Sequence, residues 1–440
     1  MTILTATILI LIIVGLQITA PKQSSPAPIV PANGVKVAST SDWQGLAWGG
    51  TRKLAVDSKG STYIAYRTQP EGRGFARAYV DFSKDNGLTW SHLGGGPIYT
   101  GGQTQRVPAI ALSSDDVIHA AWYQVPNDTG PADRQIWYSR WTGSQWITPR
   151  IIPYHIDGYL QAPDASHWQE HPDILVDRSN TQRIYVVWEG TDVANLANGK
   201  CASSNCDTPM MTVSNDNGLT WSNYTKLAPP NGEVHSRPTI VQDSTGTLRV
   251  TWYGEDPGDT GNNRIRYTFS ADQGNTWSNS TAPIPETYGT DQRYPSMAAD
   301  SQGRVHLVWK ERDTRSQNNY TLYSVLSGET WSAPIVVHSD SQNQLNAMVQ
   351  VDEKGNVYVG WNTGGPFSWN GDPPAQFDNS QIWLAKFDGN SWSTRQLSSS
   401  STNRFLNLPG NTMKSPNVPI AWVQGSSPKP YNVDYSFITF

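Results

Sequence analysis

An eight-residue phrase occurs three times in this chain with almost the same letters. It reads SKDNGLTW at Ser83 to Trp90, SNDNGLTW at Ser214 to Trp221 and SADQGNTW at Ser270 to Trp277. Asp and Gly at these positions suit a tight turn whose carboxylate accepts backbone N–H bonds, and the Trp can then pack between strands. A single active site does not need three copies, so the phrase predicts a repeated structural turn rather than a catalytic motif.

The phrase belongs to a longer repeat with four strand-like runs in each unit. Run A begins near a proline, run B ends in an aromatic residue, run C precedes the phrase, and run D starts at its final Trp. The aromatic ends of run B recur at intervals of about 50 to 65 residues, which indicates a repeat architecture. These aromatic residues are Tyr66, Trp122, Trp188, Trp252, Trp309, Trp361 and Trp422.

Four short strands per unit, without sustained 3.6-residue periodicity, predict an all-β fold: a seven-bladed β-propeller with four-stranded antiparallel blades. The seventh unit, Arg404 to Phe440, has room for runs A, B and C alone. We therefore expect the segment Gly34 to Trp43 to supply its fourth strand and close the ring. Residues 34–440 would then form a single propeller domain.

The S-x-D-x-G-x-T-W phrase resembles the Asp-box, or bacterial neuraminidase repeat, of the sialidase superfamily. Degenerate copies, WTGSQW, SGETW and FDGNSW, stand at the same place in other units, and the resemblance extends over residues 45–440. It implies a propeller that handles glycans. Sialidases of this family have six blades, so a six-bladed ring is the alternative to the seven repeats.

The N-terminal region predicts export. Residues 3–20 carry no charge, which is typical of a secretory signal peptide within residues 1–20, or otherwise of a membrane anchor. Residues 21–33, rich in Pro and Ser, are then a linker. Outside the cell, Cys201 and Cys206 are close enough in sequence to form a disulfide, whereas a metal pair lacks two further ligands nearby.

Arginines stand at or beside four run A starts, at Arg52, Arg106, Arg237 and Arg293. In sialidases an arginine of an Arg-Ile-Pro motif joins two others to bind the substrate carboxylate, which a guanidinium group does with two parallel hydrogen bonds. The stretch QRVPAIAL around Arg106 looks like that motif, and QRYPSM around Arg293 is similar. The alternative is a set of exposed arginines paired with nearby acids.

Carboxylates gather on the same predicted face, where the A starts, B ends and irregular B–C loops meet. Glycoside hydrolysis usually needs two carboxylates, while sialidases use a tyrosine helped by a glutamate and an acid/base aspartate. Each carboxylate could instead be a solvated or salt-bridged residue. The catalytic candidates are Asp128, Glu170, His171, Glu189 and Glu255, and the candidate tyrosines are Tyr123, Tyr253 and Tyr294.

Three functions fit these residues. We expect a secreted, sialidase-like glycoside hydrolase acting on an acidic glycan, because the long loops differ from blade to blade and so favour one unique site. A polysaccharide lyase would use a histidine or tyrosine for proton transfer, from His155, His167, His171 and Tyr159, with Arg237 neutralising a uronate. A non-catalytic glycan-binding module would stack sugars on Trp168 and Trp369.

The remaining expectations concern partners. We expect a carbohydrate ligand, no metal ion or other cofactor, and a monomer that is anchored to a membrane only if residues 3–20 are retained. The net charge of −5 gives no reason to expect a nucleic-acid partner.

Overall fold

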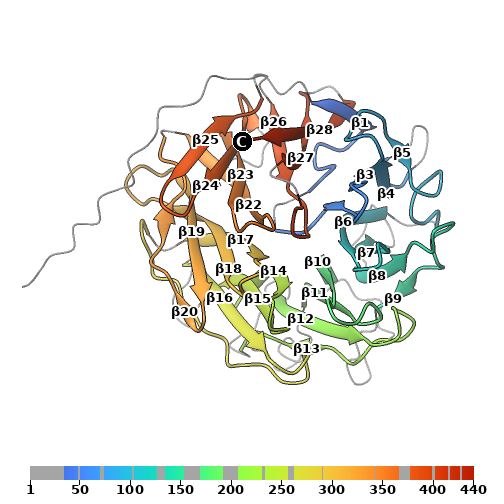
Figure 1. The fold of residues 1–440 in the computed structure, drawn as a ribbon, viewed down its shortest axis with the longest axis horizontal. Coiled ribbons are helices and arrows are strands. Elements are labelled where there is room, and N and C mark those ends of the chain that lie inside the picture. Colours follow the sequence, from blue (N-terminus) through green and yellow to red (C-terminus); the bar gives the residue numbers. More distant parts are fainter. Residues whose placement is uncertain are drawn as a thin grey trace, which may run out of the picture.

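Seven small antiparallel sheets form a ring in the computed structural model (Figure 1). The structure describes residues 34–47, 50–69, 74–101, 104–125, 134–152, 169–191, 207–229, 233–255, 262–289, 291–340, 342–365, 377–398, 402–414, 417–426 and 429–440. Seven blades rather than six are present, so the prediction of an all-β seven-bladed propeller is confirmed.

The strands follow the predicted A–B–C–D order in each blade. Blades one to three contain β2 Leu54–Val56, β3 Thr62–Thr68, β4 Arg77–Ser83 and β5 Ser91–His92; β6 Thr104–Leu112, β7 Ile118–Val125, β8 Gln135–Arg140 and β9 Arg150–Ile151; and β10 Gln169–Val176, β11 Ile184–Thr191, β12 Asp207–Ser214 and β13 Thr225–Lys226. Blades four and five contain β14 His235–Gln242, β15 Leu248–Gly254 and β16 Arg264–Ser270; and β17 Gln292–Ala299, β18 Val305–Arg312, β19 Asn319–Ser327, β20 Thr330–Trp331 and β21 Ile335–Val336. Blade six contains β22 Asn343–Val351, β23 Val357–Gly364, β24 Ile382–Phe387 and β25 Trp392–Gln396, and blade seven contains β26 Asn403–Asn407, β27 Asn417–Gln424, β28 Tyr431–Thr439 and β1 Val35–Thr40.

Strand D departs from the ideal in two blades. In blade four it is reduced to the isolated bridge between Tyr267 and Thr281, and in blade five it is split into β20 and β21. The ring closes as the sequence predicts, because β1 pairs with β28 from Val35 opposite Tyr435 to Thr40 opposite Tyr431. Figure 1 shows the first and last described strands side by side.

The core lies between neighbouring blades. The tryptophans that end run B in blades two to seven are all at most 1% exposed, as is Tyr66 in blade one. The B strands carrying them are buried on both faces, which explains why they read as continuous apolar runs rather than as alternating ones.

The three repeat turns (residues 83–90, 214–221 and 270–277) stabilise the seams between blades. In the second turn the Asp216 carboxylate accepts hydrogen bonds from the Ser214 hydroxyl and from the backbone and hydroxyl of Thr220. Gly218 there has a φ of +79° and lies against the ring of Tyr138 in the preceding blade. Trp221 packs edge-on to the same Tyr138, with ring centroids 5.1 Å apart.

The same edge-on packing of a D-strand Trp on a Tyr of the preceding blade recurs around the ring. It joins Trp90 to Tyr435, Trp331 to Tyr267 and Trp392 to Tyr323. The phrase therefore acts as a structural turn that links consecutive blades, and it lies on the face opposite the A-strand starts.

Several predictions concern residues outside the described ranges. These are the signal peptide or anchor at 1–20, the linker at 21–33 and the disulfide between Cys201 and Cys206. Within the described ranges, no helix has the length and apolar character needed to cross a membrane.

Candidate functional site

A β-bulge interrupts the start of strand A in six of the seven blades. In blades two to seven the register between strands A and B shifts at the same point. The residue within each shift has a positive φ although it is not glycine, a strained conformation that clusters at functional sites. These bulge residues are Val107, His171, Arg237, Tyr294, Asn346 and Phe405.

The residue that follows the B-strand aromatic lies close to the bulge residues. In blades two to five these residues and the bulge residues form a chain of neighbouring side chains, which we call the inner arc. Tyr123 lies edge-on to His171, Tyr253 lies edge-on to Tyr294, and the Lys310 ammonium lies 5.2 Å from the Tyr294 ring centre. The inner arc consists of Tyr123, His171, Glu189, Arg237, Tyr253, Tyr294 and Lys310.

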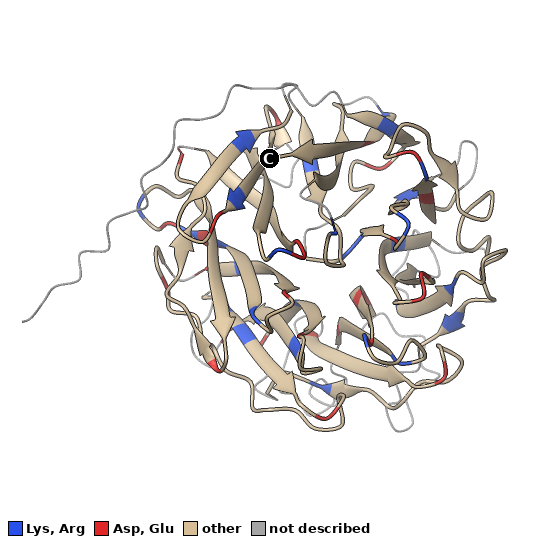
Figure 2. Cartoon of the chain, viewed as in Figure 1, with Lys and Arg blue, Asp and Glu red and all other residues tan. Residues whose placement is uncertain are grey.

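The chemistry of the ring is concentrated in this arc. The corresponding positions of blades six and seven hold Asn346, Asn362, Phe405 and Val423, which carry no charge. In blade one the equivalent Arg67 is bound to Asp42 at 2.6 Å. Figure 2 shows acidic and basic residues at the inner ends of several blades, around the axis.

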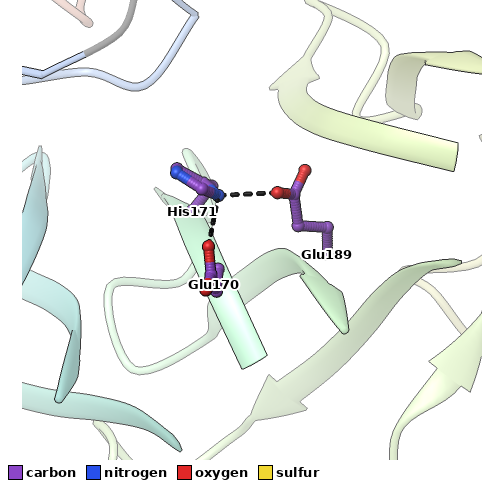
Figure 3. Close-up of side chains that lie close together, drawn as sticks. All are labelled: Glu170, His171 and Glu189. Carbon is purple, nitrogen blue, oxygen red and sulfur yellow. Dashed lines mark hydrogen bonds and ion pairs between the residues drawn. The ribbon is translucent and has the colours of Figure 1, made fainter. Parts of the chain in front are cut away.

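Glu189 and His171 form the central contact of the arc (Figure 3). His171 Nδ1 lies 2.6 Å from Glu189 Oε1 and 3.4 Å from Glu170 Oε2. The other oxygen of Glu189 accepts the backbone N–H of Arg237, whose Nη1 lies 3.7 Å from Glu189 Oε1. Two of the predicted catalytic carboxylates, the predicted histidine and one predicted arginine therefore meet at one place.

The charges of this pair follow from burial and from Arg237. Burial alone would raise the pKa of Glu189, but Arg237 and His171 outweigh it and lower the pKa to about 2. Burial, with Arg237, lowers the pKa of His171 to about 4. At neutral pH an ionised Glu189, which can only accept hydrogen bonds, faces a neutral His171. The imidazole proton is thereby held on Nδ1, and Nε2, which points away from both carboxylates in Figure 3, keeps its lone pair.

Asp207, which the sequence reasoning missed, lies beside this pair at the start of β12. Its backbone pairs with Thr191, two residues beyond Glu189. Burial raises the pKa of Asp207 to about 7, and the Glu189 charge adds to the shift. Two neighbouring carboxyl groups with pKa values moved in opposite directions are suited to opposite roles in proton transfer.

Arginines flank the arc on its blade-two side. Arg134, also missed from the sequence, forms an ion pair with Glu170, and its guanidinium lies 5.9 Å from the Tyr123 ring centre. Burial is the main cause that lowers the pKa of Arg134. The charge of Arg106 lowers it further, and Tyr123 acts in the opposite direction. Arg106 forms no ion pair with any described carboxylate, and its Nε atom is buried without a hydrogen-bond partner.

The other predicted arginines have partners. Arg293 binds Asp291 at 2.6 Å. Arg52 lies inside the channel, where it pairs with Asp173 at 3.1 Å and donates to the carbonyl groups of Ile174 and Ile240. Both guanidinium groups are therefore already paired with a carboxylate.

The remaining candidates are placed as follows. Glu255 follows β15 and is partly buried. Burial raises the pKa of both Tyr253 and Tyr294. Asp128, His155, Tyr159, His167, Trp168 and Trp369 lie outside the described residues, so their roles remain predictions.

Glu170, His171 and Glu189 could also approach a metal ion, because their ligand atoms all lie within 4.8 Å of one another. Both carboxylates, however, already have guanidinium counter-ions in Arg134 and Arg237. A cation would have to compete with these arginines for the two carboxylates.

A cavity of about 790 Å³ opens at the far end of the channel, among the A–B turns of blades one to three and blade seven. Its acidic residues already accept hydrogen bonds: Asp57 from Lys59 and Ser61, Asp177 from Ser179, and Asp116 from Ser58 of blade one. Despite its volume, we place no chemistry there, because perturbed acids and bases meet at the opposite mouth.

Comparison with known proteins identifies the repeat. The family model described as BNR repeat-like domain matches residues 116–405. Among curated proteins, none matches this chain.

Solved structures share the fold at low identity. A Penicillium chrysogenum α-L-arabinanase complexed with arabinobiose is 13% identical, with a TM-score of 0.53 over 81% of this chain and 97% of its own. A protein of unknown function from Dyadobacter fermentans is 16% identical, with a TM-score of 0.51 over 81% and 99%. A Trypanosoma rangeli sialidase in complex with a difluorosialic acid is 13% identical, with a TM-score of 0.51 over 87% of this chain and 59% of its own. At such identities the likeness concerns the fold alone.

Proposed function

This chain belongs to the family of BNR repeat-like domains, and we propose that it is an exported glycoside hydrolase that cleaves an acidic glycan at the inner arc. The observation that carries the proposal is the pairing of an anion-binding group with an acid–base group. Arg106 has no carboxylate partner among the described residues, and it stands with Arg134 beside the Glu189–His171 pair and Asp207.

The two guanidinium groups favour an anionic ligand. Arg134 and Arg106 repel each other, and the described carboxylates that act on Arg134 are Glu170, through an ion pair, and Asp207, through its charge. A carboxylate on the substrate would relieve that repulsion and accept charge-assisted hydrogen bonds, each worth about 1.5–3 kcal/mol. These residues would therefore select and orient an acidic sugar.

The acid and the base are then available for hydrolysis. Asp207, protonated up to about pH 7, would donate its proton to the glycosidic oxygen as the bond to the anomeric carbon breaks. Nε2 of His171 would accept a proton from the water that attacks that carbon, and Glu189 would stabilise the imidazolium that forms. The products are a hemiacetal and an alcohol, and the two groups exchange protons with solvent to complete the cycle.

Water rather than a tyrosine is the nucleophile in this proposal. The resemblance to sialidases implies a tyrosine nucleophile, but burial raises the pKa of Tyr253 and of Tyr294, which opposes formation of a phenolate. The proposal thus keeps the acidic substrate of the sialidases and replaces their covalent step.

A lyase is the second candidate, favoured by one observation: Nε2 of His171 has no hydrogen-bond partner among the described residues. That atom could instead remove the proton next to a uronate carboxylate while Arg106 and Arg134 neutralise the developing charge. The bond between C4 and the glycosidic oxygen would then break by elimination, with the departing oxygen taking the proton of Asp207. The products are an unsaturated sugar and a new reducing end, formed without water.

A product assay separates these candidates. Purified protein would be incubated with sialosides, uronate polymers and neutral polysaccharides, and reducing ends and ultraviolet-absorbing unsaturated products would be measured. Reducing ends without absorbance support hydrolysis, and both together support elimination. If wild-type protein yields neither but still binds acidic glycans, the chain is a glycan-binding module. His171→Gln serves as the inactive control.

Export has its own test. N-terminal sequencing of protein recovered from the medium should begin after residue 20 if the signal peptide is removed. Thiol titration of the same material should find no free thiol if Cys201 and Cys206 are bridged, whereas two reactive thiols would contradict the disulfide.

A further inference from the structure

The inner arc ends in a cation that the proposed reaction does not use. Lys310 stands one residue after Trp309, the position that Glu189 occupies in blade three. Its side chain is 7% exposed. Burial lowers the pKa of its ammonium group to about 8, so the group is still charged at neutral pH.

The surroundings of Lys310 do not neutralise it. No described carboxylate lies within ion-pair distance of its ammonium group. Asp291 is the nearby acid, and its carboxylate is already bound to Arg293 at 2.6 Å. The contact seen for the ammonium is the face of Tyr294, 5.2 Å from the ring centre. A cation–π contact of this kind contributes roughly 0.5–2 kcal/mol, too little to replace the hydration lost on burial.

Arg293 strengthens the basic character of this end of the arc. Its guanidinium lies 5.7 Å from the ring centre of Tyr253, and its backbone pairs with Lys310 across β17 and β18. Among the described residues Asp291 is the acid whose charge acts on Lys310, and the two cations together outweigh it. The site thus has two basic centres, Arg106 with Arg134 on its blade-two side and Arg293 with Lys310 on its blade-five side, with the Glu189–His171 pair in blade three between them.

We propose that the inner arc binds a polyanionic glycan rather than a single acidic sugar, and that Lys310 and Arg293 bind a second anionic substituent on a neighbouring sugar residue. This inference rests on the proposed function and specifies its substrate. A carboxylate and a sulfate ester present the same anionic oxygens to these two cations, so the recognised group is one of the two. A substrate with a single acid would leave the blade-five centre unfilled.

The test compares ligands that differ in one acidic group. Initial rates would be measured with a uronate trisaccharide and with the same trisaccharide carrying a single carboxylate, the others reduced to alcohols. For Lys310→Met, we expect KM for the polyanionic trisaccharide to rise at least tenfold with kcat nearly unchanged. KM for the mono-acidic trisaccharide should not change. Lys310→Arg, which keeps the charge, should restore most of the lost affinity, and a sulfated mono-uronate in the same assay shows whether sulfate can fill the second position.

The outcomes separate this inference from the proposed function. Lys84→Met, an exposed lysine in a repeat turn on the other face, is the matched control and should alter neither KM. Suppose that wild type cleaves both trisaccharides and that Lys310→Met either raises both KM values equally or changes neither. The proposal of a second anionic subsite is then contradicted, while the proposed function stands. If wild type cleaves neither of these trisaccharides nor any acidic glycan of the panel above, the proposed function fails. A Lys310→Met protein with an altered melting temperature would be replaced by Lys310→Gln before the comparison is drawn.

Discussion

Nδ1 of His171 lies 2.6 Å from Oε1 of Glu189, and the two residues belong to neighbouring strands of one blade. The contact holds the imidazole proton on Nδ1. Glu189→Gln should keep the shape of the site but remove that control, lowering kcat by about 10²–10⁴ as for loss of a general base. His171→Gln should cost as much, and the double variant little more, because the two residues act as one unit. Nitrogen NMR of the His171 ring would report the proton on Nδ1 in wild type and a mixture of tautomers in Glu189→Gln.

Glu329→Gln is the control for that experiment, since it removes a carboxylate from an exposed turn on the opposite face. If both Glu189→Gln and Glu329→Gln retain wild-type kcat, the contact between Glu189 and His171 has no part in the reaction.

The pH dependence of the reaction should be bell-shaped. His171 must be neutral to accept a proton, so the rate should fall as the pH drops through about 4. Asp207 must be protonated to donate one, so the rate should fall as the pH rises through about 7. Asp207→Asn should lower kcat/KM and abolish the alkaline limb. A profile that rises steadily from pH 5 to pH 9 would show that Asp207 is not the acid. Because Asp207 and Glu189 interact, the observed limbs belong to the pair.

Gly218 should be irreplaceable for the packing of blade three on blade two. A Cβ atom at this position would lie 2.0 Å from the Tyr138 ring, and its φ is +79°. Gly143 offers a matched control, because its φ of +94° is equally unfavourable for alanine but nothing lies within 4 Å of the added atom. Gly143→Ala should cost about 1–2 kcal/mol of unfolding free energy for the backbone alone. Gly218→Ala should cost about 1–3 kcal/mol more through overpacking, measured by chemical denaturation. Equal losses in the two variants would contradict the seam contact.

The repeat turns should matter for stability and not for chemistry. Asp216→Ala removes the acceptor of bonds from Ser214, Leu219 and Thr220 and should lower the unfolding free energy by about 1–2 kcal/mol. The specific activity of the protein that remains folded should match wild type. An activity loss at an unchanged melting temperature would mean that the turn takes part in the reaction.

The fold could be predicted from the sequence because its determinants are local and repeated. A proline-led run, an aromatic at the end of the next run and the turn phrase each recur, and even the closing strand β1 followed from the missing fourth strand of blade seven. Because each of these features recurs from blade to blade, every copy adds to the evidence for the same fold. The shortened D strand of blade four was not predictable, because the bridge between Tyr267 and Thr281 depends on packing rather than on a motif.

The residues that meet in the candidate site could be predicted in part from their places in the strands. Glu170, His171, Glu189 and Arg237 were identified because they stand at strand ends, and the structure brings them together. Asp207 and Arg134 were missed because they stand at, or one residue before, the start of strand C, where the sequence carries no repeated marker. Lys310 could have been predicted, because it directly follows Trp309 as Glu189 follows Trp188. The bulge residues could also have been predicted, because several of them precede a proline.

The central claim is that a substrate carboxylate is bound by Arg106 next to the acid–base group, and one comparison of specificity constants tests it most directly. Wild type and Arg106→Ala would be assayed with an acidic glycan and with the same glycan after reduction of its carboxyl group to an alcohol. One lost charged hydrogen bond of about 1.5–3 kcal/mol corresponds to at least a tenfold fall in kcat/KM for the acidic substrate. The same variant should cleave the reduced substrate as slowly as wild type does, because the bond is absent in both. A fall of equal size on both substrates, or on neither, would contradict the claim.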